Sequence, residues 1–455
     1  MESQAPHNLI RVLERCAVAP PPRSFPTTAL PLTFFDVLWL QIPPVQRLFF
    51  YQLPDTDTDT TALLSKLKHS LSLALQIFYP LAGILTHNSA TDRHEILYSE
   101  GDSVRLTIAH SDSDFNRLVG HEPCDATEFH PLAPNIPEYA TLPSPALALQ
   151  VTLFPNSGLC VGLAVHHAAA DGWSSTHFMK AWASIYRTGD ISTVHPLPVY
   201  DRAQTVALDW IAESYFRHLA ELPRVEVTNR FFAGDATASS RLVRATYVLT
   251  RGDIERLRGW VAARVVGDSR FSSFVVTCSY VWACLTKASA RSGAVDGGKT
   301  VYFAMAVDLR ARLRPPLAPA YFGNCIGACF TQAAESELIG EDGLVVAAES
   351  IRGAIGGLEG DGALRGADTW VKTFFGLVGE RVLSIAGSPL LRVYDTQFGW
   401  GKPRKVEVLS IEDTGAISLA ESRDEDGGIE IGLAVPDSEM DGFECFFREG
   451  LERLR

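Results

Sequence analysis

Residues 146–189 constrain the fold most strongly, because two apolar runs, a turn and a helical pattern follow one another without a gap. The run ALALQVTLF precedes the turn sequence PNSG at 155–158, and LCVGLAV follows it, which predicts a β-hairpin. Residues 174–176 can cap a helix over HFMKAWASIYR, and Gly189 can end it. The segment therefore predicts two paired strands leading into a helix, with His166 and His167 at the junction.

Helical and strand patterns alternate along the rest of the chain. Leu63, Leu64, Leu67, Leu71 and Leu75 recur at helical spacing and predict a helix over 60–78. Strands are predicted for HEILYS, SVRLTIA and VYFAMAVDL, helices for SSFVVTCSYVWACLTKA and LVVAAESIRGAI, and a hairpin for AISLAES with GIEIGLAV. Residues 353–366 are rich in glycine and are expected to form a mobile surface loop. The predicted fold class is mixed α/β.

The length of 455 residues exceeds one ordinary hydrophobic core and predicts two domains. The pattern loosens after Thr188, where HPLPVYDRAQ has no period and contains two prolines. We therefore place an N-terminal domain at 1–195, a crossover linker at 196–225 and a C-terminal domain of similar size at 226–455.

The bulk composition argues against several classes of partner. The net charge of −13 disfavours a nucleic-acid or anionic membrane surface, which needs clusters of Lys and Arg. No apolar run has the length of a membrane span, and the N-terminus lacks a signal peptide. Eight cysteines without a CxxC pair predict reduced thiols in a cytoplasmic protein.

Two short motifs match catalytic patterns in the wrong structural context. GAVDGGKT at 293–300 fits the Walker A pattern, but a helix precedes it and a strand follows, the reverse of a phosphate-binding loop. GNCIG at 323–327 puts Cys325 where a nucleophile elbow has its serine, yet ACFTQ after it predicts a strand instead of a helix. We interpret the first as a turn and Cys325 as a small packed residue.

The spacing His-x-x-x-Asp occurs three times and differs in its setting. His110 with Asp114, and His121 with Asp125, lie in polar stretches that we expect to be solvated loops. His167 instead ends an apolar strand before a helix, where a side chain can be held rigidly at the edge of a cavity. Strand alternation puts His167 on the side of Leu163 and Val165, and His166 on the other side.

An imidazole in this position can act as a general base, because it titrates near neutrality and can remove a hydroxyl proton. Asp171 could orient the ring of His167 or turn away and hold the loop through an ion pair; the sequence leaves both roles open. A satisfied core histidine is the simpler alternative. No GxSxG motif or zinc-ligand spacing accompanies the pair, so neither a serine intermediate nor a metal is predicted.

Two signatures in the right order give the chain a resemblance to the plant BAHD acyltransferases, which transfer acyl groups from coenzyme A thioesters. HHAAADG carries HxxxD at His167 and Asp171, and residues 397–401 (QFGWG) match the second signature near the C-terminus. LPLTFFDVLWL, LKHSLSLALQIFYPLAGIL, VDLRARL and SLAESRDEDGGIEIGLAV extend the resemblance over nearly the whole chain. YFGNC at 321–325 resembles a marker of the branch that acylates anthocyanins, flavonoids and other phenolic glycosides, often with malonyl groups.

This resemblance implies two chloramphenicol-acetyltransferase-like domains with a channel between them, entered by CoA from one face and by the acceptor from the other. It implies that His167 deprotonates an acceptor hydroxyl, which attacks the thioester without an acyl-enzyme. Acyl-CoA is then a cosubstrate, and no cofactor or metal is expected.

Supporting roles also follow from the resemblance. Asp171 would pair with an arginine of VDLRARL, Arg310 rather than Arg312, and the loop residues Phe398, Gly399, Trp400 and Gly401 would be structural. Residues expected along the channel are Thr33 on the acceptor side, Tyr321, Phe322, Gly323, Asn324 and Cys325, and Ser272 or Ser273 near the CoA phosphates at a helix N-terminus.

Two departures from the family pattern affect these expectations. Gln397 replaces the aspartate of the second signature, and losing one partner of a buried ion pair can cost about 3–5 kcal/mol. Trp173 in DGWSS supplies no cation for the free carboxylate of a malonyl donor. Lys180 and Arg187 would serve only if the helix turned them inward, and solvated helix charges are the simpler interpretation.

The predicted function is a monomeric, CoA-dependent O-acyltransferase that acts on a phenolic glycoside, with malonyl-CoA favoured as donor. One alternative is a hydroxycinnamoyl-CoA transferase with another alcohol or an amine as acceptor. Another is a catalytically silent homologue that binds small ligands. A peptide-forming condensation domain is disfavoured, because QFGWG and YFGNC have no place in it.

Overall fold

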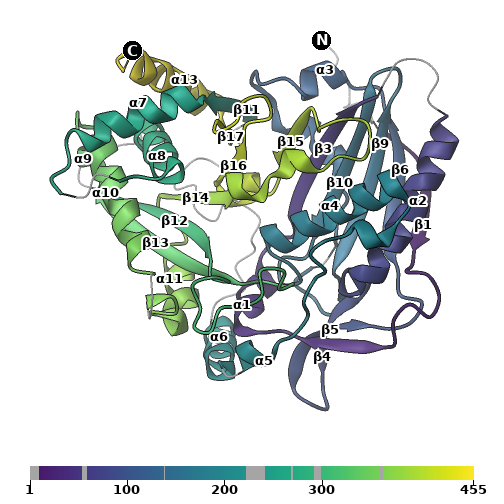
Figure 1. The fold of residues 1–455 in the computed structure, drawn as a ribbon. Helices are drawn as coiled ribbons and strands as arrows, with labels where there is room; N and C mark the ends of the chain where they lie inside the picture. Colours follow the sequence, from purple (N-terminus) through teal and green to yellow (C-terminus); the bar gives the residue numbers. More distant parts are fainter. Residues whose placement is uncertain are drawn as a thin grey trace, which may run out of the picture.

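The structure is a computed structural model, and it describes residues 10–53, 59–137, 139–206, 208–221, 241–267, 270–291, 299–358 and 362–454. Its described strands form three sheets (Figure 1). The first has the order β1 (Ile10–Val18), β6 (Val104–Ser111), β9 (Leu147–Phe154), β10 (Gly158–Val165), β3 (Val45–Gln52) and β15 (Lys405–Val408).

The second sheet has the order β13 (Ile326–Ala334), β12 (Thr300–Asp308), β14 (Val382–Gly387), β16 (Ile417–Glu421), β17 (Ile429–Pro436), β11 (Leu242–Leu249) and β7 (Cys124–Asp125). The third is small: β2 (Thr28–Pro31), β5 (Arg93–Tyr98), β4 (Ile84–Asn88) and β8 (Ser144–Pro145). The predicted hairpins are confirmed, with Phe154 opposite Gly158 in one and Glu421 opposite Ile429 in the other.

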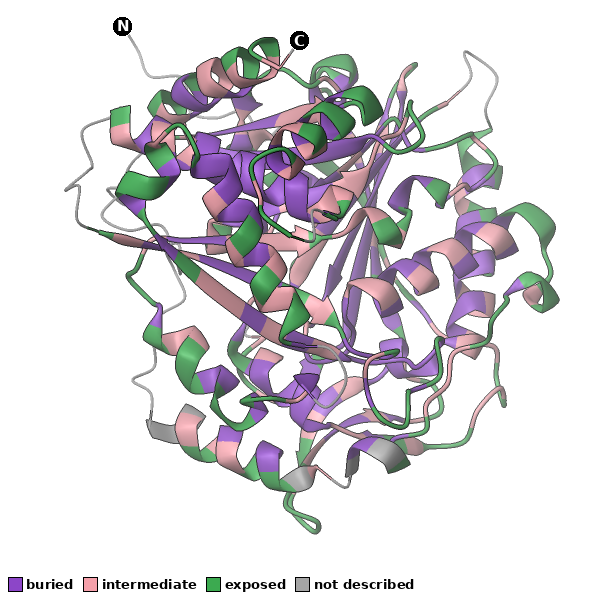
Figure 2. Ribbon diagram, turned by 60° about the vertical axis from the view of Figure 1, so that its left-hand side comes forward, coloured by how far each residue is buried: buried purple, intermediate pink, exposed green. Residues whose placement is uncertain are grey.

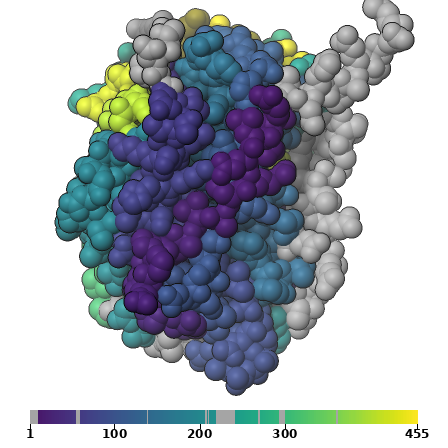
Figure 3. Space-filling view, turned by 90° about the vertical axis from the view of Figure 1, so that its right-hand side faces the viewer, coloured from purple at the N-terminus to yellow at the C-terminus, as the bar shows by residue number. Residues whose placement is uncertain are grey.

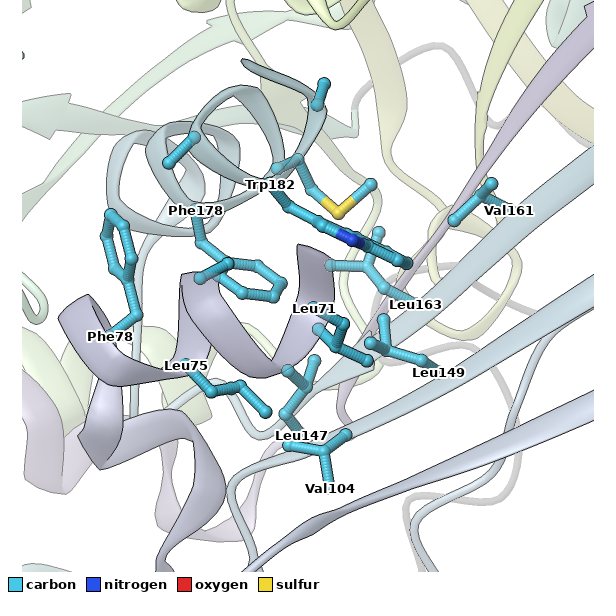
Figure 4. Close-up of a cluster of buried hydrophobic side chains, with 14 of the residues drawn as sticks. Leu71, Leu75, Phe78, Val104, Leu147, Leu149, Val161, Leu163, Phe178 and Trp182 are labelled. Carbon is cyan, nitrogen blue, oxygen red and sulfur yellow. The ribbon is translucent and has the colours of Figure 1, made fainter. Parts of the chain in front are cut away.

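Two helices, α2 (Thr60–Ile77) and α4 (Gly172–Thr188), cover one face of the first sheet. Figure 4 shows how their apolar sides meet the strands: Leu71 and Leu75 of α2 and Phe178 and Trp182 of α4 converge on Leu147, Leu149 and Leu163. Full burial of such side chains is worth about 1.5–3 kcal/mol each. This core fixes the start of α4, and with it the residues that follow β10.

The second sheet packs against α7 (Arg251–Ala262), α8 (Ser273–Arg291), α10 (Gly343–Gly356) and α13 (Asp437–Glu452). The other described α-helices are α1 (Phe34–Val37), α3 (Phe115–Leu118), α5 (Ala203–Val206), α6 (Asp209–Glu221), α9 (Glu335–Ile339), α11 (Trp370–Gly376) and α12 (Ile411–Thr414). Buried residues concentrate in the sheets and on the inner sides of the helices (Figure 2). The mixed α/β class is therefore confirmed.

The two halves of the sequence exchange strands. β15, from the C-terminal half, pairs with β3 in the first sheet, and β7, from the N-terminal half, pairs with β11 in the second. One face of the molecule nevertheless consists mostly of N-terminal residues (Figure 3). The domain boundaries at 195 and 226 stay a prediction, since each half contributes a strand to the other's sheet.

Several local predictions were wrong. Asp171, not residues 174–176, caps α4, because its carboxylate accepts the Ser174 amide at 2.9 Å. His110 lies in β6 instead of a loop. Helix α10 extends to Gly356, so part of the expected glycine-rich loop is helical, while residues 359–361 lie outside the described residues.

Most of the Walker A match, which we interpreted as a turn, lies outside the described residues, because these exclude 292–298. The strand expected after it is β12, which begins at Thr300. Among the helices that the structure describes, none combines the length and the apolarity needed to cross a membrane.

Candidate active site

His167 is the second residue after the end of β10, and its ring lies nearly parallel to the indole of Trp39. The two ring centroids are 3.8 Å apart, and the planes differ by 8°. His166, on the other side of the strand, is fully buried, with Nε2 at 3.0 Å from the Tyr139 carbonyl oxygen. Only the half-buried His167 is therefore placed to meet a ligand.

The environment of His167 keeps its imidazole neutral. Burial lowers the pKa of His167 to about 4, although its own carbonyl and Asp171 act in the opposite direction. The ring Nδ1 is buried and has no hydrogen-bond partner from another described residue. At neutral pH the ring is thus an unprotonated base.

Asp171 is turned away from the imidazole and tied into its surroundings. Its Oδ1 accepts the Ser174 amide, and its Oδ2 accepts Arg310 Nη2 at 2.8 Å and the Cys325 amide at 3.2 Å. The pair with Arg310 is buried, with side chains 1% and 5% exposed. Of the two roles that the sequence left open, this geometry matches the ion pair that holds the loop.

Arg310 connects this ion pair to YFGNC. Its guanidinium donates to the carbonyls of Tyr321 and Gly323 at 3.2 and 3.0 Å, and to Asp308. The Ser174 hydroxyl also bonds the backbone of Gly323. The first turn of α4 and the strand pair β12–β13 are therefore locked together around one buried charge pair.

Cys325 is buried beside Asp171, directly before β13. Burial raises the pKa of its thiol far above the usual range, so no thiolate forms at neutral pH. The segment after it is extended, as expected, so the strand-turn-helix geometry of a nucleophile elbow is missing here.

A second buried charge network, which the sequence did not reveal, lies beside the first. Asp36 is fully buried and accepts the Thr33 hydroxyl at 2.9 Å, Arg202 Nη1 at 3.0 Å and the Asn324 side-chain amide at 2.9 Å. Asn324 also donates to the carbonyl of His167 at 2.8 Å. The network thus reaches the backbone of His167. Asp36 stands in the quoted segment LPLTFFD, but a lone acidic residue there gave no signal of burial.

Arg202 explains the glycine of YFGNC. Gly323 has a φ of +126°, and a Cβ at this position would lie 2.7 Å from the Arg202 guanidinium. Arg202 in turn donates to the Tyr321 hydroxyl at 2.6 Å. Phe322 points into the core of the first sheet. Only glycine combines this backbone conformation with this close approach.

The QFGWG loop is an aromatic packing unit. Phe398 is fully buried, edge-on to Tyr51 and Trp182, and Trp400 stacks on it with centroids 5.3 Å apart. Gly399 and Gly401 have φ values of +105° and +92°. Gln397 is only half-buried and forms no hydrogen bond with another described residue.

Ser272 and Ser273 are not brought to this site by any described contact. Ser272 accepts the Val275 amide at the start of α8, and Ser273 accepts Arg258 Nη2 at 2.9 Å. Lys180 is not a solvated helix charge, because it is half-buried and donates to the Leu391 carbonyl at 2.8 Å. Arg187 is exposed. No cluster of the described residues could hold a metal ion.

Trp173 is half-buried and packs against the ion pair. The Arg310 guanidinium lies 5.3 Å from the Trp173 ring centroid, and His177 lies 4.9 Å from that ring, centroid to centroid. Trp173 thus shields Arg310 from solvent.

Known proteins match the chain along its whole length. A model described as the Transferase family matches residues 10–449. Malonyl-coenzyme A:anthocyanin 3-O-glucoside-6''-O-malonyltransferase of Dahlia pinnata is 36% identical, over 97% of this chain and 98% of its own. Phenolic glucoside malonyltransferase 2 of Arabidopsis thaliana is 39% identical, over 97% and 99%.

Solved structures share the fold at lower identity. Vinorine Synthase has a TM-score of 0.71 at 22% identity, over 95% of this chain and 96% of its own. F. graminearum TRI101, complexed with Coenzyme A and Deoxynivalenol, has a TM-score of 0.66 at 16% identity, over 92% and 97%. The family match and the full-length relatives confirm the resemblance: the chain belongs to the BAHD acyltransferases of the Transferase family.

Proposed function

We propose that this chain transfers a malonyl group from malonyl-CoA to a sugar hydroxyl of a phenolic or flavonoid glycoside, with His167 as general base. The observation that carries the proposal is the neutral imidazole of His167, which stacks on Trp39 while Asn324 holds the backbone carbonyl of the same residue. The chain is similar to malonyltransferases over 97% of its length.

The chemical step needs one base and no covalent enzyme intermediate. His167 takes the proton of the acceptor hydroxyl as its oxygen attacks the thioester carbonyl. The tetrahedral intermediate collapses, the carbon–sulfur bond breaks, and the imidazolium returns the proton to the CoA thiolate. A ring with a pKa of about 4 is wholly in the basic form at neutral pH, which supports this role.

In the same proposal, Asp171 and Arg310 position the loop that carries His167 and do not touch substrate. Their buried ion pair joins the N-terminus of α4 to YFGNC. Thr33 and residues 321–325 lie near the reaction centre, where Thr33 and Asn324 bond Asp36. The QFGWG loop packs against α4, with Phe398 against Trp182 and Tyr186. The placement of CoA phosphates near Ser272 or Ser273 stays a proposal.

One second candidate is supported by a specific observation. Coumaroyl-CoA:anthocyanidin 3-O-glucoside-6''-O-coumaroyltransferase 1 of Arabidopsis thaliana is 33% identical, over 98% of this chain and 98% of its own. An aromatic donor to the same class of acceptor is therefore the alternative. For cellular context we propose a cytoplasmic monomer; its eight cysteines are free, which agrees with a reducing compartment.

The experiment that tests this proposal measures the free CoA thiol that the purified protein releases. Malonyl-, acetyl-, p-coumaroyl- and caffeoyl-CoA are each paired with flavonoid glucosides and with their aglycones. We expect turnover only with glucosides, fastest with malonyl-CoA, and a loss of about 10²–10⁴-fold in His167→Ala. A folded wild-type protein that binds CoA and turns over no pair would favour the silent-homologue alternative.

A further inference from the structure

A small cavity lies between the two large sheets, and the side chain of Arg47 faces it. Its volume is about 20 Å³, and its wall includes Arg47 of β3, Leu391, Val406 of β15, and Ser418 and Gly432 of the second sheet. This is room for one or two water molecules, or for a group the size of one carboxylate.

Arg47 is buried without a counter-ion. Arg47 is 4% exposed, yet its guanidinium makes a single hydrogen bond with the described residues, from Nη1 to the Thr176 hydroxyl at 2.9 Å. Nε is buried without a partner, and Arg47 forms no ion pair with any described carboxylate. Buried charges in proteins are nearly always paired, because an isolated charge loses its hydration. Burial lowers the pKa of Arg47 to about 10, so it remains a cation at neutral pH.

The carboxyl groups around the cavity do not neutralise Arg47. Glu407 is already paired with Lys405 and Arg244. Glu430 accepts the Tyr394 hydroxyl and the Arg423 amide, and burial raises its pKa.

Glu421 is the charge that acts most on Arg47, but the two do not touch, and one Glu421 oxygen is buried and unpartnered. Burial also raises the pKa of Glu421, although backbone hydrogen bonds act in the opposite direction. Lys180, the other nearby cation, is occupied by the Leu391 carbonyl.

The cavity adjoins the start of the catalytic helix α4. Leu391 lines it, and the same side chain lies 3.2 Å from the point where a Cβ on Gly172 would stand. The Thr176 hydroxyl that accepts from Arg47 donates to the Gly172 carbonyl at 2.7 Å. Arg47 is therefore connected through one hydroxyl to the residue that follows Asp171.

We propose that Arg47 binds the free carboxylate of the acyl donor, and that it makes this enzyme selective for a malonyl thioester. The inference rests on the proposed acyl transfer and specifies its donor site. It supplies the cation that the DGWSS segment lacks. The volume of the cavity admits a carboxylate but not an aromatic ring, which disfavours hydroxycinnamoyl donors.

The test compares malonyl-CoA with acetyl-CoA, which differ by that carboxylate, at a saturating concentration of one flavonoid glucoside. Arg47→Gln is expected to lose about 30- to 100-fold in kcat/KM for malonyl-CoA, mainly through KM, and much less for acetyl-CoA. Arg47→Lys keeps the charge and is expected to fall between. Arg15→Gln is the matched control, because Arg15 is an exposed arginine on β1 of the same sheet.

Calorimetric binding of malonyl-CoA and acetyl-CoA to each folded variant keeps this test separate from the proposed function. Absence of turnover by the wild-type protein would refute the acyl transfer, while a malonyl-selective affinity lost in Arg47→Gln would still support the carboxylate site. If Arg47→Gln does not fold, the affinities of Arg47→Lys for malonyl-CoA and acetyl-CoA are compared instead. A lower ratio of malonyl to acetyl affinity than in wild type would support the inference. An unchanged ratio in the folded variants would overturn the inference and assign Arg47 to a water-bridged pair with Glu421.

Discussion

The imidazole of His167 and the indole of Trp39 lie face to face at 3.8 Å, nearly parallel. Trp39 comes from the turn after α1, more than a hundred residues before His167 in the sequence. The stacking covers one face of the ring and contributes to the burial that lowers its pKa. It leaves His167 in one orientation, with the carbonyl of the same residue held by Asn324.

Removing this indole is expected to shift the pH dependence of the reaction. In the wild-type enzyme the acid limb of kcat/KM should lie near pH 4, because His167 loses its base form only below its pKa. Trp39→Ala exposes the ring, so the limb should move up towards the ordinary pKa of 6.5. Trp39→Phe keeps a stacked ring and should stay close to wild type. Superimposable profiles for Trp39→Ala and wild type would show that the indole does not control the base.

The ion pair between Asp171 and Arg310 should behave as a structural unit. Asp171→Asn and Arg310→Met should each lower the free energy of unfolding by about 3–5 kcal/mol. Arg310→Met leaves the buried Asp171 without a cation, and Asp171→Asn leaves Arg310 with only the half-exposed Asp308 as a counter-ion. The double variant should lose less than the sum of the two. Arg448→Met, which breaks the exposed pair with Glu444, should cost less than about 1 kcal/mol. Urea unfolding measures all four, and strict additivity would contradict the coupling.

Substitution of Gly323 in YFGNC is expected to destabilise the fold for two separable reasons. Gly323→Ala meets both a positive φ and the Arg202 guanidinium, whereas Gly401→Ala meets a positive φ with open space around it. Strained backbone alone costs about 1–3 kcal/mol. Gly323→Ala should therefore lower the melting temperature more than Gly401→Ala. Equal losses would mean that Arg202 moves aside freely.

Truncation of the aromatic loop should reduce stability and leave substrate selection intact. Phe398→Ala removes a fully buried ring between Tyr51 and Trp182 and should cost about 3–5 kcal/mol. Phe398→Leu refills much of that space and should cost less. KM values for donor and acceptor, measured on the remaining folded protein at low temperature, should match wild type. A selective rise in one KM would place the loop in a substrate site.

Two half-buried histidines, His167 and His177, should make the protein less stable as the pH falls. Burial lowers the pKa of both His167 and His177 to about 4 in the folded state, against 6.5 without it. Between pH 6.5 and 4 the unfolded chain binds protons that the folded chain excludes, so this stabilisation is complete above 6.5 and lost on acidification. His177→Gln removes one such site. The loss in unfolding free energy between pH 7 and 5 should be smaller in this variant than in wild type.

The sequence by itself determined the elements and the family. Periodicity placed α2, the β9–β10 hairpin and β16–β17, because alternation and helical spacing record which side of each element is buried. The order HxxxD, YFGNC and QFGWG identified the BAHD resemblance. The residue types alone did not identify the first residue of α4. Asp171 and the serines after it are all favourable N-cap residues, and only the backbone conformation shows that Asp171 is the cap.

Only the tertiary structure decided what surrounds the candidate base. Trp39, Asp36, Arg202 and Arg47 are ordinary residues in the sequence, and each acquires its role from partners more than a hundred positions away. The exchange of β7 and β15 between the sheets is equally non-local. Burial and pairing of charges depend on which elements meet in space. A one-dimensional pattern records the buried face of an element but not the neighbour that buries it.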